Sequence, residues 1–169
     1  LMAISFVLSG VFMYLFVKNE LGEKAAFTAG VFYLFAPFHL VNMHFQVTIA
    51  MTLSYLFLPL NLYVTRKIIL ENKTKWFISF SILEALFILS HQVISLTFLP
   101  INILYALFLI KDKNKKIIRL LTFSSSLVLG IMMSSFYWLP IVFESKYTQS
   151  AIGSHSIFFP SIIDLLYSP

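Results

Sequence analysis

The sequence predicts an all-α fold, a polytopic transmembrane helix bundle of about six spanning helices. Of its 169 residues 59% are hydrophobic and only 11% are charged, and the mean hydropathy is +0.89. Soluble domains carry about 25% charged residues, so 12 Lys and Arg with 7 Asp and Glu are too few to cover a water-soluble core. The absence of cysteine excludes a disulfide-stapled scaffold. The remaining class is an integral membrane protein.

The apolar runs between charge clusters define the spans. A helix rises about 1.5 Å per residue and the hydrocarbon core is about 30 Å thick, so one crossing takes about 20 residues. The run 25–65 has no charged residue and is long enough for two crossings. The run 76–110, whose one charged residue is Glu84, also predicts two crossings but is slightly short of the full distance. Because backbone groups must be paired in lipid, each crossing is a helix. The predicted spans are residues 1–17, 25–41, 46–65, 76–90, 93–110 and 120–143.

The basic residues orient these spans. The loops 18–24, 66–75 and 111–119 contain eleven of the twelve Lys and Arg residues, and only Lys146 lies elsewhere. Loops rich in Lys and Arg stay in the cytoplasm, so these three loops are predicted to be cytoplasmic. The net charge of +5 therefore reflects topology, and no nucleic-acid partner is expected. The predicted partner is the lipid bilayer.

Polar residues concentrate at two turns on the predicted outer side. The segment 76–90 is only about 22 Å long as a helix, so the turn after it is expected to lie below the membrane surface, and His91 to line a recessed, outward-open cavity. Polar backbone at that depth requires surrounding protein or water. The substrate-binding candidates at the two turns are His39, His44 and Gln46 in the first and Ser90, His91 and Gln92 in the second.

Glu84 is the one ionisable residue deep within a predicted span. It precedes His91 by seven residues, close to two helical turns, so the two share a helix face if the helix extends that far. Two interpretations stay open: a polar pocket or proton path, and a hydrogen-bonded structural acid. The histidine spacing has no zinc signature, so no metal site is predicted, and no enzyme motif is present.

Five short motifs extend in order over nearly the whole chain. They are Ala36-Pro37-Phe38-His39-Leu40-Val41-Asn42, Phe57-Leu58-Pro59-Leu60, Leu89-Ser90-His91-Gln92, Phe136-Tyr137-Trp138-Leu139-Pro140 and Leu165-Leu166-Tyr167-Ser168-Pro169. In the order and spacing of these motifs the sequence resembles the prokaryotic membrane proteins described as 6-pyruvoyl-tetrahydropterin synthase-related domain proteins. Gln46 and Ala50-Met51 stand where many members have an Arg and a Gly-Glu pair, which weighs against phosphate binding at that turn.

The resemblance implies a polytopic C-type glycosyltransferase-like protein of the prokaryotic plasma membrane that uses a polyprenyl-phosphate-linked sugar at the outer face. The catalytic acid would lie upstream of Leu1, so the catalytic residues are unknown. We expect 1–169 to be a single transmembrane region cut at both ends, with an outer-side tail at 144–169. No cofactor is evident, and a divalent metal in the full-length protein stays open. The alternatives are a membrane transporter, a lipid flippase and a non-catalytic cell-envelope scaffold.

Overall fold

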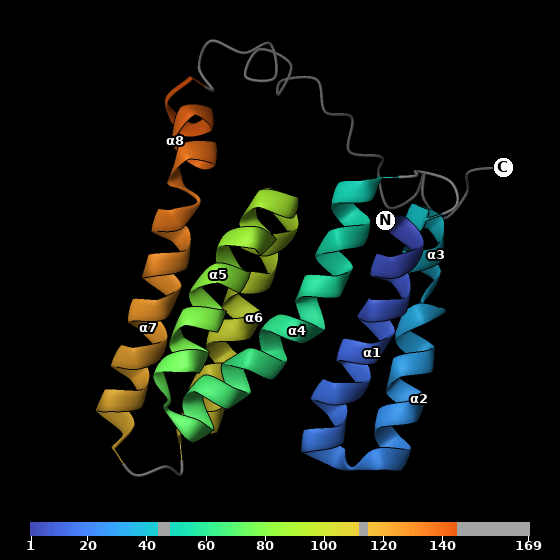
Figure 1. Cartoon of the computed structure of the whole chain (residues 1–169), viewed down its shortest axis with the longest axis horizontal. Coiled ribbons are helices and arrows are strands. Elements are labelled where there is room, and N and C mark those ends of the chain that lie inside the picture. Colours follow the sequence, from blue (N-terminus) through green and yellow to red (C-terminus); the bar gives the residue numbers. More distant parts are fainter. Residues whose placement is uncertain (44–47, 112–114, 145–169) are drawn as a thin grey trace, which may run out of the picture. The chain divides into compact units, whose positions relative to one another are not determined.

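The computed structural model describes residues 1–43, 48–111 and 115–144, and the regular structure within them is entirely helical (Figure 1). This confirms the predicted all-α class. The contacts divide the chain into two units, Leu1–Ser135 and Phe136–Pro169. The helices are α1 (Met2–Leu21), α2 (Glu23–Leu34), α3 (Pro37–Val41), α4 (Ile49–Glu71), α5 (Thr74–Ser90), α6 (Gln92–Ile110), α7 (Lys116–Met133) and α8 (Ser135–Glu144).

Two of the predicted spans are interrupted in the structure. The span 25–41 is divided into α2 and α3, because a proline disfavours the helical conformation in the residue before it; Ala36 accordingly has φ −56° and ψ 130°. The span 120–143 is divided into α7 and α8 around Ser134. Among the described residues, α1, α6 and α7 are long and apolar enough to cross a membrane. The number of six spans stays a prediction.

Helix α4 is the central helix of the first unit, since it packs against α1, α5, α6 and α7. Part of its buried surface is polar, including Thr52, Ser54, Asn61 and Thr65. Helices in lipid associate through small and hydrogen-bonding side chains more than through hydrophobic burial. The apolar core beside them consists of Val64, Ile68, Ile69, Phe80, Leu83, Ala106, Ile110 and Phe123.

The predicted cytoplasmic loops meet at one end of this unit (Figure 1). Arg66 Nε donates to Glu20 Oε1 over 2.7 Å, and the Tyr105 hydroxyl donates to the same oxygen. Arg119 donates to the backbone carbonyls of Ile69 and Leu70. Residues of all three basic loops therefore lie at the same end, as the predicted topology requires. That this end faces the cytoplasm stays a prediction.

A second carboxylate organises the loop between α4 and α5. Glu71 accepts hydrogen bonds from the Trp76 indole at 2.8 Å and the Lys67 ammonium at 3.0 Å, and Lys73 lies 3.1 Å away. These donors favour the charged form and lower the pKa of Glu71 to about 2. The two helices are thus joined by a charged contact as well as by a short turn.

Candidate functional site

His39 is buried at the end of the unit opposite the basic loops, with an exposed fraction of 3%. Its ring lies against the rings of Phe6, Tyr33 and Tyr55, at centroid distances of 5.0, 5.6 and 4.7 Å. Its Nδ1 lies 3.2 Å from the backbone carbonyl oxygen of Tyr33. A carbonyl only accepts, so Nδ1 carries the proton and Nε2 is an acceptor. That Nε2 is buried and has no hydrogen-bond partner within residues 1–43, 48–111 and 115–144.

Asn42 follows one helical turn later and is also fully buried. Its Nδ2 donates to the Phe38 carbonyl at 2.8 Å and to the Tyr55 hydroxyl at 2.9 Å. Its Oδ1 is a second buried acceptor for which the described part of the chain supplies no partner. Tyr55 is held in turn by Tyr33, whose hydroxyl donates to the Tyr55 carbonyl at 2.7 Å. Residues of α2, α3 and α4 thus surround two unpaired acceptors.

The second predicted turn presents a donor. His91 caps α6, because its Nδ1 accepts from the Ile94 amide at 3.4 Å. The proton of a neutral His91 is therefore on Nε2. Ser90 Oγ lies 3.0 Å from Ser54 Oγ of α4. Since Tyr55 contacts Asn42, the adjacent residues Ser54 and Tyr55 connect the two turns through α4.

An apolar groove of about 320 Å³ lies between these turns and is called here the α4–α6 groove. Phe38 and Tyr55 line it on the side of His39 and Asn42. Val93 and Ile94 line it directly after His91-Gln92. The groove has apolar walls, and polar residues precede or contact some of the residues that line it. Such an arrangement suits an amphiphilic ligand. The full lining is Phe38, Met51, Tyr55, Leu58, Val93, Ile94, Thr97, Phe98 and Ile101.

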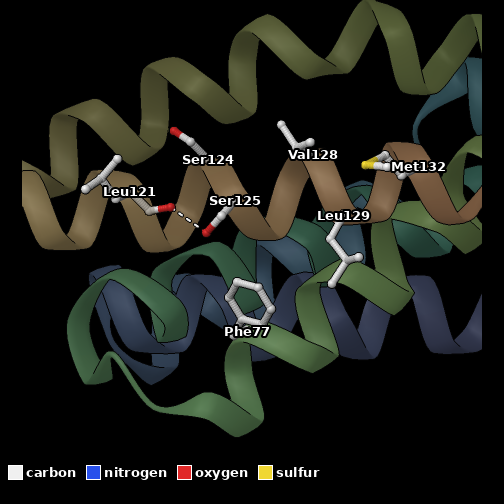
Figure 2. A pocket seen from close by; sticks show the side chains of 7 residues that line it. All are labelled: Phe77, Leu121, Ser124, Ser125, Val128, Leu129 and Met132. Carbon is white, nitrogen blue, oxygen red and sulfur yellow. Dashed lines mark hydrogen bonds between the residues drawn. The ribbon is translucent and has the colours of Figure 1, made fainter.

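A larger hollow of about 540 Å³ lies along α7, and Figure 2 shows that Phe77 faces it from outside that helix. The Ser125 hydroxyl in it donates to the Leu121 carbonyl of its own helix at 2.6 Å. Its lining is mostly apolar and largely exposed, which suits contact with lipid chains. The other α7 residues that line it are Leu121, Ser124, Val128, Leu129 and Met132.

Glu84 belongs to a hydrogen-bonded chain inside the bundle. Glu84 Oε2 accepts from Asn61 Nδ2 at 2.6 Å, and Asn61 Oδ1 accepts from Asn102 Nδ2 at 2.6 Å. Asn102 Oδ1 accepts from the Thr65 hydroxyl at 2.8 Å. All four residues are buried, so α4, α5 and α6 are joined by polar contacts in their interior.

Helix α7 packs closely against Glu84, at one end of this hydrogen-bonded network. A Cβ atom on Gly130 would lie 2.8 Å from both the Glu84 Cβ and the Ser81 carbonyl oxygen. The Ser81 hydroxyl also donates to the Ser126 carbonyl at 2.9 Å. The close approach of Gly130 to Glu84 favours the interpretation of Glu84 as a structural acid over that of a pocket residue.

Three members of this network, Asn61, Thr65 and Asn102, were not predicted from the sequence. A signal was present, because both asparagines end a Phe-Leu-Pro-x-Asn motif, at 57–61 and at 98–102. An amide within an apolar span needs a partner in the protein. The repeat therefore marks both amides as residues that need partners, but it does not identify those partners.

Two of the predicted site residues contact the N-terminal part of α4: His39 lies against Tyr55, and Ser90 lies against Ser54. His91 and Gln92 follow Ser90 at the start of α6, directly before the groove residues Val93 and Ile94. Glu84 lies apart from them in the interior chain. His44 and Gln46 lie outside the described residues. Within the described part of the chain, no group of three or more His, Cys, Asp or Glu side chains is placed to hold a metal ion.

Comparison with known proteins identifies one family. The family model described as "6-pyruvoyl-tetrahydropterin synthase related domain; membrane protein" matches residues 1–165. No curated protein and no solved structure gives a significant match.

Proposed function

Because the chain belongs to this family of membrane proteins, we propose that it binds a polyprenyl-phosphate-linked sugar as part of a glycosyltransferase-like protein. The binding site is the α4–α6 groove with the polar residues next to it. The observation that carries the proposal is an apolar groove whose lining residues Val93 and Ile94 directly follow the donor His91, and whose lining residue Tyr55 contacts the buried residues His39 and Asn42. A lipid-linked sugar has matching parts: an apolar chain, a phosphate and hydroxyl groups.

The polyprenyl chain occupies the groove. Its walls are aromatic and aliphatic, and several wall residues are open to the membrane, such as Val93 at 66% exposed and Ile101 at 55%. An isoprenoid chain in the bilayer enters such a groove sideways without crossing a polar barrier. Phe38 and Tyr55 then lie between the polyprenyl chain and the buried acceptor atoms of His39 and Asn42.

The phosphate lies at the start of α6. The His91 Nε2–H points a donor away from the helix cap, and the Gln92 side chain adds an amide. The N-terminus of a helix attracts anions through its unpaired N–H groups and its dipole. His91 thus orients the phosphate and is not the base of the reaction.

The reaction itself uses an acid outside the described residues. That carboxylate removes the proton of an acceptor hydroxyl, whose oxygen attacks the anomeric carbon of the sugar. The bond from that carbon to the phosphate oxygen breaks, and polyprenyl phosphate leaves. In this proposal the groove lies at the outer face of a prokaryotic plasma membrane, and the basic loops lie in the cytoplasm.

The test measures binding of a polyprenyl-phosphate hexose to the full-length protein in nanodiscs. Thr97→Trp fills the groove, whereas Leu96→Trp adds the same ring to the neighbouring residue, which is 57% exposed and does not line the groove. We expect Thr97→Trp to weaken binding at least about tenfold and Leu96→Trp to leave it within about twofold. Equal affinities in the two variants would contradict the assigned groove.

The reaction is tested by turnover in the same nanodiscs and by transport in proteoliposomes. Release of polyprenyl phosphate with transfer of the hexose to an acceptor supports the glycosyltransferase-like role. Movement of the intact lipid-linked sugar across the bilayer without turnover would overturn it in favour of a flippase. Binding without turnover or movement would favour a non-catalytic scaffold.

A further inference from the structure

Two buried acceptors, one in α3 and one in the residue that follows it, lack the donors that buried acceptors require. His39 is 3% exposed and Asn42 is 0% exposed, and among the residues that the structure describes neither His39 Nε2 nor Asn42 Oδ1 has a hydrogen-bond partner. The residues are three positions apart on a helical segment, so they lie on the same face. Leaving one such atom unpaired is costlier than a typical hydrogen bond is favourable, and buried groups without partners are rare. Two on one face indicate a missing donor.

The orientation of both groups is determined by their other contacts. His39 Nδ1 is occupied by the Tyr33 carbonyl, and Asn42 Nδ2 donates to the Phe38 carbonyl and the Tyr55 hydroxyl. Reversing the Asn42 amide would place its oxygen against the Phe38 carbonyl oxygen, which also only accepts. The atoms left over are therefore two acceptors.

The chemistry of the missing partner follows from this. Phosphate and carboxylate oxygens are acceptors and do not pair with acceptors. A protonated His39 would bury a charge, because the side chain is 3% exposed, and would still need an acceptor for its Nε2–H, which is unfavourable. A neutral ligand with hydroxyl groups supplies O–H donors to both atoms without burying a charge.

We infer that His39 and Asn42 form a subsite for the hydroxyl groups of a ligand headgroup. The subsite is closed in this structure, and the ligand enters when α3 shifts away from Tyr55. Helix α3 has only five residues, and Ala36 before it is extended; the shift breaks the ring contacts of His39 with Phe6 and Tyr55. The hydroxyl groups have two possible sources. The first is the sugar of the carrier lipid, and for this source the inference rests on the proposed function. The other source is a membrane lipid with a polyol headgroup, such as phosphatidylglycerol.

Two substitutions at one position separate binding from folding. His39→Phe keeps a ring against Phe6 and Tyr55 but removes the acceptor. The Tyr33 carbonyl still receives the Ala36 amide, at 3.5 Å, so folding is preserved. His39→Gln is the matched control, because its side-chain oxygen reaches about as far as Nε2 and restores an acceptor.

The experiment compares the affinities of the full-length protein in nanodiscs for polyprenyl-phosphate hexose and for polyprenyl phosphate without sugar. We expect His39→Phe to weaken binding of the hexose probe about tenfold and to leave the sugar-free probe unchanged. His39→Gln should recover most of the loss. Melting temperature is measured in parallel, and His39→Phe is expected to maintain it.

Three results would overturn the inference. Equal loss for both probes would show that His39 does not distinguish the sugar. No loss for either would show that it touches neither. In His39→Phe, the melting temperature could fall while the ratio of the affinities for the hexose probe and the sugar-free probe stays as in the wild type. That result would indicate that the two acceptors bind a buried water molecule and no ligand.

A second experiment, with membrane lipids, tests the hydroxyl subsite independently of the proposed function. If the wild-type protein binds neither carrier probe, the proposed function fails. Native mass spectrometry then measures how much phosphatidylglycerol and how much phosphatidic acid stay bound to the protein. The ratio of the two lipids is compared between the wild type and His39→Phe. A preference for the glycerol headgroup that His39→Phe abolishes supports the hydroxyl subsite, and the absence of such a preference overturns it.

Discussion

The side-chain amide of Asn102 donates to the side-chain oxygen of Asn61 over 2.6 Å, and each residue ends a copy of the same Phe-Leu-Pro-x-Asn motif. The two helices run in the same direction, since Arg66 near the end of α4 and Tyr105 near the end of α6 both reach Glu20. Proline interrupts the helical hydrogen bonds at the same place in both. Helices α4 and α6 are therefore alike in sequence and paired in register.

Removing the asparagines tests this pairing. Asn61→Leu takes away the donor to Glu84 and the acceptor of Asn102, whereas Asn102→Leu leaves the Glu84 contact intact. We expect both to lower the free energy of unfolding by about 1–3 kcal/mol, with Asn61→Leu the larger. The measurement is denaturant unfolding in detergent, with Leu104→Val on the exposed side of α6 as the control. A double variant whose effect equals the sum of the single ones would argue against direct coupling.

Gly130 tests the closure of α7 on Glu84. Gly130→Ala places a Cβ at 2.8 Å from the Ser81 carbonyl oxygen and the Glu84 Cβ, so the helices must separate. We expect a loss of about 1–3 kcal/mol in unfolding free energy, although alanine favours helix more than glycine does. Ser125→Ala, on the exposed side of α7, should change stability little. An unchanged or higher stability of Gly130→Ala would show that α5 and α7 are less closely packed than this.

The lowered pKa of Glu71 predicts that the folded protein loses stability at acid pH. Its pKa falls from the ordinary 4.5 to about 2 in the folded protein, because Trp76, Lys67 and Lys73 stabilise the carboxylate. A lowered pKa in the folded state means that the stabilisation is full above pH 4.5 and is lost as the pH falls toward 2. Glu71→Gln should therefore flatten the decline in melting temperature over that interval. Lys24→Gln, at the same end of the unit, should keep the decline of the wild type.

Thiol labelling tests the predicted topology, and the absence of cysteine makes single-cysteine variants direct to prepare. His91→Cys should react with an impermeant maleimide added outside intact cells, because the turn at His91 is predicted to face outward. Lys111→Cys should react only after permeabilisation. Labelling of position 91 from the cytoplasmic side alone would reverse the orientation and with it the proposed placement of the groove.

The helical class and most of the turns between helices could be predicted from the amino-acid sequence. The charge clusters located the turns near Gly22, Asn72 and Lys111, because charged side chains are excluded from lipid. The turn at His91 was also predicted, since clustered polar residues interrupt apolar runs, whereas the break before Pro37 falls inside the predicted span 25–41 and was missed. The extension of α4 through Glu71 was missed, because a helix continues past the membrane surface wherever its polar residues find partners.

Composition and charge pattern alone determined that the chain is an all-α membrane protein, and they showed where its polar residues depart from the apolar background. They did not determine what those residues contact. Only the tertiary structure paired Asn61 with Asn102 and placed Tyr55 against His39 and Asn42. The physical reason is that a buried polar group requires a partner, but its identity depends on which helix faces meet, and those lie far apart in the chain.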